Sequence, residues 1–260
     1  MPGNPLEPRM SLLARSVWLT TAVAATITAT CLSSSGCILR LGSWGATYGS
    51  GPVTSEDRPL VGPVRSVIVG NAMRVQVMQA KNTSLRITAP ADVLPRIETR
   101  LDGDTLSIDL LSGTYSGDMV VIITTPAIRD LHLSGACTAE VAGLAGDRCD
   151  IELSGASQAT VRGAAGQAHV QVSGASRAEL AGVSASRWQV DCSGASTCVL
   201  AGSAQDAGLE ASGASTIDAH RLQAKHADAQ ADGASTIRLG RVGSLRQETS
   251  GASTITAEQP

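Results

Sequence analysis

The amino-acid sequence predicts an all-β protein whose C-terminal half is a right-handed parallel β-helix, a single-stranded solenoid. Three observations predict this fold: a repeat of 18 to 20 residues, two short alternating strands in each repeat, and a shortage of large side chains. The 260-residue chain has no Phe, two Tyr and three Trp, so its core must be thin. A narrow solenoid meets that constraint better than a sandwich or an α/β enzyme.

The repeat is the tetrapeptide Ser-Gly-Ala-Ser, or a one-residue variant of it, and it occurs seven times. Glycine accepts a positive φ, and Ala and Ser are small enough for identical segments to stack, so the tetrapeptide predicts a structural corner. The seven corner glycines are Gly135, Gly155, Gly174, Gly194, Gly213, Gly233 and Gly251.

Alternating apolar positions flank every corner. In the first coil Leu131 and Leu133 precede the glycine and enclose His132, while Ala139 and Val141 follow it. This period of two indicates a strand with one buried face on each side of the corner. No coil could bury its apolar face alone, so the coils are expected to stack in register at about 4.8 Å. A second turn is expected eight residues after the corner, at Gly143, Gly163, Gly182 and Gly202.

Residues 64–130 lack the tetrapeptide but are rich in strand-forming residues. Strands are expected over 64–69, 74–77, 85–89, 105–110 and 120–124, and one helical turn within 90–100. We interpret this segment as the irregular first coils of the solenoid, which serve as its N-terminal cap.

The N-terminus predicts an export signal, because a basic start is followed by an apolar run over 17–27 that is too short to span a bilayer. Residues 32–37 resemble a bacterial lipoprotein signal, in which Cys37 would be lipidated after cleavage; Cys31 is a poorer candidate. Plain secretory cleavage and an uncleaved anchor are the alternatives. By resemblance to Gram-negative lipoproteins, Ile38 after the cysteine favours the outer membrane.

The domain organisation follows from these segments. We predict an export or lipoprotein signal over 1–37, a Gly/Pro-rich linker over 38–62, and the β-helix over 63–258.

Two stretches carry a family resemblance: the run from Pro126 to Ala136 (PAIRDLHLSGA) with its repeating Ser-Gly-Ala-Ser, and the upstream run from Gly103 to Ile108 (GDTLSI). Over about residues 64–257 the chain resembles the head GIN domain of auto-transporter adhesins (DUF2807). The resemblance implies a right-handed parallel β-helix of bacterial lipoproteins and surface proteins, with no established catalytic residues.

The sequence contains none of the motifs typical of a hydrolase nucleophile, a zinc protease, a P-loop or a CxxC site. Its four histidines fall at different coil positions, so neither a metal site nor a cofactor is expected. Basic residues are scattered and the net charge is −3, which argues against a nucleic-acid partner.

Outward positions before the corners form the main candidate for a ligand surface. They predict a strip of acidic and amide groups, as in β-helices that bind sugar; the simpler interpretation is a solvated strand face. The strip consists of Glu152, Gln171, Asp191, Glu210, Gln230 and Glu248. A column of corner serines, from Ser157 to Ser253, and of the threonines that follow it is a second candidate, for which corner packing is the simpler explanation.

Four cysteines follow the signal, in a compartment that permits disulfides. Cys192 and Cys198 occupy inward positions on either side of one corner, and Cys137 and Cys149 flank the next turn. The pairs 192–198 and 137–149 are therefore conceivable; the alternative is four small buried side chains.

Together these features favour an exported, lipid-tethered protein of the cell envelope, with an outer-membrane location. We expect a non-catalytic, adhesin-like binding module that contacts a polysaccharide or an envelope protein. The alternatives are a polysaccharide-active enzyme and an accessory protein that recognises a protein partner. An exposed strand at the end of the solenoid also predicts a homo-dimer through that end.

Overall fold

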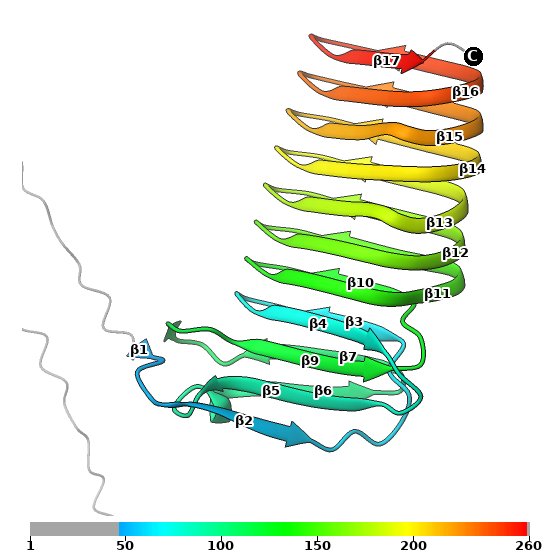
Figure 1. Ribbon diagram of the computed structural model, residues 1–260. Coiled ribbons are helices and arrows are strands. Elements are labelled where there is room, and N and C mark those ends of the chain that lie inside the picture. Colours follow the sequence, from blue (N-terminus) through cyan, green and yellow to red (C-terminus); the bar gives the residue numbers. More distant parts are fainter. Residues whose placement is uncertain (1–46, 259–260) are drawn as a thin grey trace, which may run out of the picture. The chain divides into compact units, whose positions relative to one another are not determined.

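The computed structural model describes residues 47–258 and shows an all-β solenoid of stacked parallel coils, as predicted (Figure 1). Within residues 47–258 the one helical element is the 3-10 turn η1 (Leu94–Arg96), which lies inside the range predicted for a helical turn. No helix in this range is long and apolar enough to cross a bilayer.

Each coil is one long strand that begins after one corner and ends before the next. Neighbouring coils bend at the same place, and their ladder pairing continues around some of these bends but is interrupted at others, for example between Leu180 and Arg187. The expected second turn is therefore no loop but a register irregularity within the ladder, for example between Ala142 and Leu144. The coils are β11 (Thr138–Leu153), β12 (Gln158–Val172), β13 (Arg177–Cys192), β14 (Thr197–Ala211), β15 (Thr216–Ala231) and β16 (Thr236–Thr249).

The corners are the most regular part of the molecule. All seven predicted glycines have φ between 70° and 87°. The alanine after each glycine donates its backbone N–H to the carbonyl of the corner one coil earlier, at 2.7–2.8 Å. A Cβ on Gly194 would lie 2.7 Å from the Gly174 carbonyl oxygen, so glycine is required both by the dihedral and by the space.

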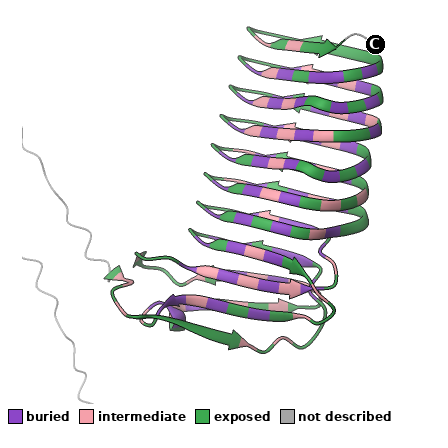
Figure 2. Cartoon of the chain, in the orientation of Figure 1, coloured by how far each residue is buried: buried purple, intermediate pink, exposed green. Residues whose placement is uncertain are grey.

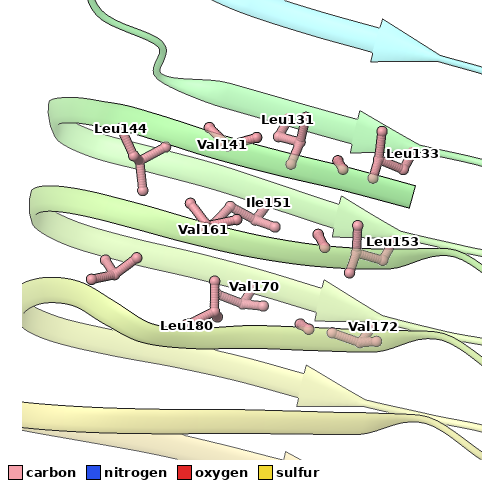
Figure 3. Packing of buried hydrophobic residues seen from close by; sticks show 14 of the residues in the cluster. Leu131, Leu133, Val141, Leu144, Ile151, Leu153, Val161, Val170, Val172 and Leu180 are labelled. Carbon is pink, nitrogen blue, oxygen red and sulfur yellow. The ribbon is translucent and has the colours of Figure 1, made fainter. Parts of the chain in front are cut away.

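The core lies between the two strand segments of each coil and is made mostly of small side chains. Figure 3 shows Leu131, Val141 and their stacked counterparts pointing between the two sheets. Buried and exposed residues alternate along the strands (Figure 2). Trp188 is the largest fully buried side chain in the described residues: it is 1% exposed, and its register partners Ala168 and Ala207 leave room for it.

The coil stacked directly below the seven repeats has no Ser-Gly-Ala-Ser tetrapeptide. β3 (Ser66–Val69) pairs with β10 (Asp130–Leu133), and β4 (Arg74–Gln79) pairs with β11. The corner between β3 and β4 contains Asn71 at φ 70°, and Asn71 accepts the same corner hydrogen bond from Ala136. Asn tolerates this conformation better than most residues, so the backbone repeats where the sequence does not.

Residues 64–130 form irregular capping coils, as expected, but these coils do not follow one another in chain order. β7 (Thr105–Leu110) stacks parallel on β3 and β9 (Val120–Thr125) stacks parallel on β4, so β7 and β9 form a second coil below β3 and β4 although they come later in the chain. The antiparallel strands of the cap were not expected: they are β6 (Ile97–Asp102), β5 (Ser84–Pro90) and β2 (Val53–Arg58).

The predicted linker also needs correction, because the ordered domain begins before residue 63. β1 (Thr47–Tyr48) pairs with β8 (Thr114–Tyr115), and β2 adds a strand to the cap. The Asp92 carboxylate accepts the Gly49 N–H at 2.8 Å, and Arg58 donates to the Leu94 carbonyl at 2.9 Å. The rest of the linker and the signal, with Cys31 and Cys37, lie outside the described residues.

At the other end β17 (Thr254–Glu258) pairs along one edge with β16. Its second edge has no partner strand within residues 47–258. The homo-dimer expected through this end stays a prediction.

The corner geometry makes a direct prediction. Replacing Gly194 with Ala should lower the free energy of unfolding by about 1–3 kcal/mol, because the new side chain forces both strain and a backbone clash. Asn71→Gly should be tolerated, since it keeps the positive φ. Denaturant unfolding followed by circular dichroism measures both.

The matched control is Gly182→Ala, where the nearest atom is the Arg162 side chain and φ is outside the left-handed region. An unfolding midpoint for Gly194→Ala equal to that of the control would show that the corner does not need glycine.

Candidate functional site

The structure places all six residues of the predicted strip in one column across successive coils. Each is the register partner of the next, at the strand spacing of about 4.8 Å. We call the outward surface of the segments before the corners the ladder face; this column runs through it. The column is Glu152, Gln171, Asp191, Glu210, Gln230 and Glu248.

The carboxylates at the two ends of this column have polar side-chain partners. His132 lies 2.9 Å from a Glu152 carboxylate oxygen, and Arg246 donates to Glu248 at 2.8 Å. Both pairs are at the surface, where such contacts contribute little stability and mainly orient the side chains.

The middle of the column is different, because two carboxylates face each other there. Asp191 and Glu210 are direct register partners. Within residues 47–258 neither forms an ion pair or a side-chain hydrogen bond with another residue. Like charges opposite each other on neighbouring strands are destabilising, so this pair lowers the stability of the folded state and is not explained by folding.

A shallow groove of about 250 Å³ surrounds this pair. Asp232, Ser193 and Ser212 add a carboxylate and two hydroxyls to the oxygens of Asp191 and Glu210. Such a surface accepts hydrogen bonds from hydroxyl or ammonium donors. No group of three or more metal-ligating side chains occurs in the described part of the chain.

Asp232 was missed as a candidate, although the sequence contains a signal for it. It stands where the other six corners all have Ser, in the variant Asp-Gly-Ala-Ser. The structure shows its carboxylate accepting a hydrogen bond from the Ser250 hydroxyl of the next coil. A departure from an otherwise repeated small residue was the available clue.

The second candidate column, the corner serines, has a structural role in the corners. Five of its members are buried, and the Ser215 hydroxyl donates to the Cys192 carbonyl at 3.1 Å. Ser196 and Ser235 make equivalent bonds at 3.0 Å. These bonds support the corner-packing explanation. The adjacent threonines are half-exposed at Thr197, Thr216 and Thr236 and exposed at Thr254.

The histidines do not converge on a common site. His132 pairs with Glu152, His220 contacts Asp218, and the remaining two contact polar side chains of their own or the adjacent coil. Their distribution matches solvated positions along different faces.

All four described cysteines are buried free thiols. Cys192 and Cys198 are in hydrogen-bond contact across their corner, and this contact together with burial raises the pKa of Cys198 well above its usual range. Burial, followed by the nearby Asp130 and Asp150 carboxylates, raises the pKa of Cys149 to about 11.

The suggested pair 137–149 is wrong. The Cys137 sulfur lies at the corner, 3.8 Å from the Val69 carbonyl oxygen. Val69 aligns through Leu133 with Leu153, which lies four residues after Cys149 on an extended strand. Four strand residues span about 13 Å, beyond the separation of about 7 Å between Cα atoms that a disulfide allows.

These positions predict that the two cysteine pairs differ in oxidation state in an oxidising compartment. We expect exported protein to contain a disulfide between Cys192 and Cys198. Cys137 and Cys149 should react with iodoacetamide only after unfolding, because burial hides both thiols and raises the pKa of each. Peptide mass spectrometry without reduction checks this, with cytoplasmic protein as the reduced control. Alkylation of native Cys192 in exported protein would contradict the prediction.

Comparison with known proteins identifies the class to which this solenoid belongs. The family model described as "putative auto-transporter adhesin, head GIN domain" matches residues 65–258, so the chain belongs to that family. Such membership indicates an exported or surface protein with a binding role. The curated proteins contain no significant match to this chain.

Several solved structures share the fold. A putative adhesin from Parabacteroides distasonis has a TM-score of 0.69 at 17% identity, covering 81% of this chain and 98% of that one. A putative adhesin from Bacteroides fragilis has a TM-score of 0.59 at 19% identity, covering 83% and 100%. A putative lipid binding protein from Parabacteroides distasonis has a TM-score of 0.66 at 15% identity, covering 82% and 100%.

Proposed function

We propose that this protein is a lipid-tethered, non-catalytic, adhesin-like module of the bacterial cell envelope that binds polysaccharide through the ladder face. The observation that carries the proposal is the uncompensated pair Asp191 and Glu210, set in a groove of further oxygen acceptors.

Folding explains the corners and the core but not this pair. The corner is determined by backbone geometry, and the core by the inward positions; both leave the outward residues free. Neutral side chains opposite each other would be more stable than two carboxylates. Retaining the carboxylates makes sense if a ligand supplies donors, and sugar hydroxyls are donors that bond strongly to ionised acceptors.

The tether is the second part of the proposal. The lipoprotein-like signal ending at Cys37 would anchor the chain, with Ile38 favouring the outer membrane. Membership of the adhesin head family supports an exported location. Labelling with radioactive palmitate, with Cys37→Ser and Cys31→Ser compared, distinguishes lipidation at Cys37 from the alternatives.

The proposal predicts a trade between stability and binding. The double variant Asp191→Asn, Glu210→Gln should raise the free energy of unfolding by about 0.2–1 kcal/mol, because it removes a like-charge pair. It should also weaken polysaccharide binding about tenfold or more, because hydrogen bonds to charged acceptors are lost. Denaturant unfolding and a glycan array on the detergent-released, exported protein measure the two effects.

Glu140→Gln is the matched control, since Glu140 is an exposed carboxylate on the opposite sheet. Equal binding by the double variant and the control would contradict the role of the ladder face. Product formation from a bound polysaccharide would support an enzyme instead, and binding of a protein but no glycan would support an accessory role.

A further inference from the structure

The last coil of the solenoid has an open edge. It consists of residues 244–249 of β16, the corner at Gly251, and β17, and we call it the final coil. Both strand segments pair with the coil below, and within residues 47–258 neither has a partner strand on its other side. The final coil lies at the end of the stack opposite β2 (Figure 1). Neither segment contains Pro or Lys, residues that commonly keep a strand edge from pairing.

The core is uncovered at the final coil. Ile237, one coil below, is fully buried, whereas its register partner Ile255 is only half-buried. Leu245 is 36% exposed, although its register partner Ala227 is buried. Exposed apolar side chains beside an unpaired strand edge favour contact with another strand.

Two inward positions of the final coil are polar. Gln247 and Thr249 stand where the coil below has Ala229 and Ala231. A polar terminal coil keeps the end of a solenoid soluble, which explains these two residues but not the exposed apolar side chains beside them. Polar residues that meet inside an interface can also fix its register.

The backbone groups at the open edge determine which residues a partner strand can bond. The Ser250 N–H donates to the coil below at 2.9 Å, and the Thr254 N–H does the same at 3.0 Å. Because these groups alternate in direction along an extended strand, the odd-numbered residues direct their N–H and C=O groups toward the open side. These residues are Leu245, Gln247 and Thr249 in β16 and Ile255 and Ala257 in β17.

A second copy of this chain fits the edge in one antiparallel register. If a two-fold axis passes through Gln247, this residue bonds to its own copy, and Leu245 bonds to Thr249 of the other copy. In that register Arg246 of each copy lies opposite Glu248 of the other. Moving the axis by one residue would place Arg246 opposite Arg246, or Glu248 opposite Glu248, which is destabilising. The charges therefore select the register centred on Gln247, whose amide can both donate to and accept from its copy.

The same axis also fits β17. The contact between Cys192 and Cys198 shows that the residue two before a corner glycine faces the residue four after it. By the period of two, the residue four before the glycine faces the residue six after it, so Gln247 faces Ala257. A two-fold axis through Gln247 therefore meets β17 at Ala257, whose backbone groups also point to the open side. One rotation thus pairs both strands of the final coil with their copies.

We propose that two copies of this chain associate through their final coils as a symmetric dimer, held by antiparallel strand pairing and by two Arg246–Glu248 contacts between the copies. The dimer does not depend on whether the ladder face binds polysaccharide. Because the axis runs from one sheet to the other, the ladder faces of both copies lie on the same side. A polysaccharide bound there would meet two Asp191–Glu210 pairs, which increases its avidity.

Sedimentation of the exported full-length protein in a density-matched detergent measures the association. Wild-type protein should form dimers. Arg246→Glu should raise the dissociation constant about tenfold or more, because it places like charges opposite each other twice. The double variant Arg246→Glu, Glu248→Arg should restore the association, because each pair again has opposite charges. The control is Arg177→Glu: Arg177 donates to Glu179 on its own strand at 2.9 Å, and that strand is paired on both sides.

Single cysteines test the register. Copper-catalysed oxidation of Gln247→Cys should give a covalent dimer, because residues opposite each other in a bonded antiparallel pair have Cα atoms about 5.5 Å apart. Thr249→Cys is the matched control on the same strand and the same inward face. Its two copies would lie about 13 Å apart along the strands, too far for a disulfide.

Sedimentation as a monomer at every concentration would overturn the dimer, and so would an unchanged dissociation constant in Arg246→Glu. Cross-linking of Thr249→Cys as readily as Gln247→Cys would overturn the register and with it the interface. If the dimer forms as described but the glycan array is silent, the final-coil interface stands and the proposed polysaccharide binding fails. Glycan binding by a strictly monomeric protein would mean the reverse.

Discussion

The structure depends on one hydrogen bond, repeated from coil to coil at the corner. Each corner alanine donates its N–H to the carbonyl of the preceding corner, which a residue in the left-handed region turns toward it. Seven glycines and Asn71 hold this conformation. Because the bond fixes the height and register of every corner, the strands on both sides stack without slipping, and a one-residue slip would move every apolar side chain outward.

A core of Ala, Val, Leu and Ile is sufficient once the register is fixed. The two strand segments of a coil stand close enough for small side chains to fill the space, and Trp188 fits only because its neighbours in the column are alanines. The outward side chains, in contrast, are not needed to fill the core or to fix the register. At these positions the chain can place Asp191 opposite Glu210, and for that reason function is sought on the ladder face.

The sequence was sufficient to predict the solenoid, its corners and most of its strands, because these repeat a local pattern of small and alternating residues. It predicted both strands of the coil around Asn71 but not its corner, because the residues from Gly70 to Met73 adopt the backbone conformation of the other corners with a different sequence. The antiparallel cap and β2 were missed for a different reason: their partners lie far apart in the chain, and Gly and Pro nearby suggested a linker. Alignment of the strip could be predicted from spacing, whereas the groove depends on side-chain positions that spacing does not fix.

The most direct test of the central claim is hydrogen exchange at the corner amides, read residue by residue by NMR. The alanine side chains at the corners are exposed, so their amides would exchange quickly if the corners were ordinary surface turns. The account predicts that the amides of Ala156, Ala175, Ala195, Ala214 and Ala234 are protected as strongly as those of the strands beside them. If these amides exchange at the rate of an open loop while the strand amides stay protected, the account is contradicted. The corner hydrogen bonds would then be a consequence of the stacking of the coils and would not stabilise it.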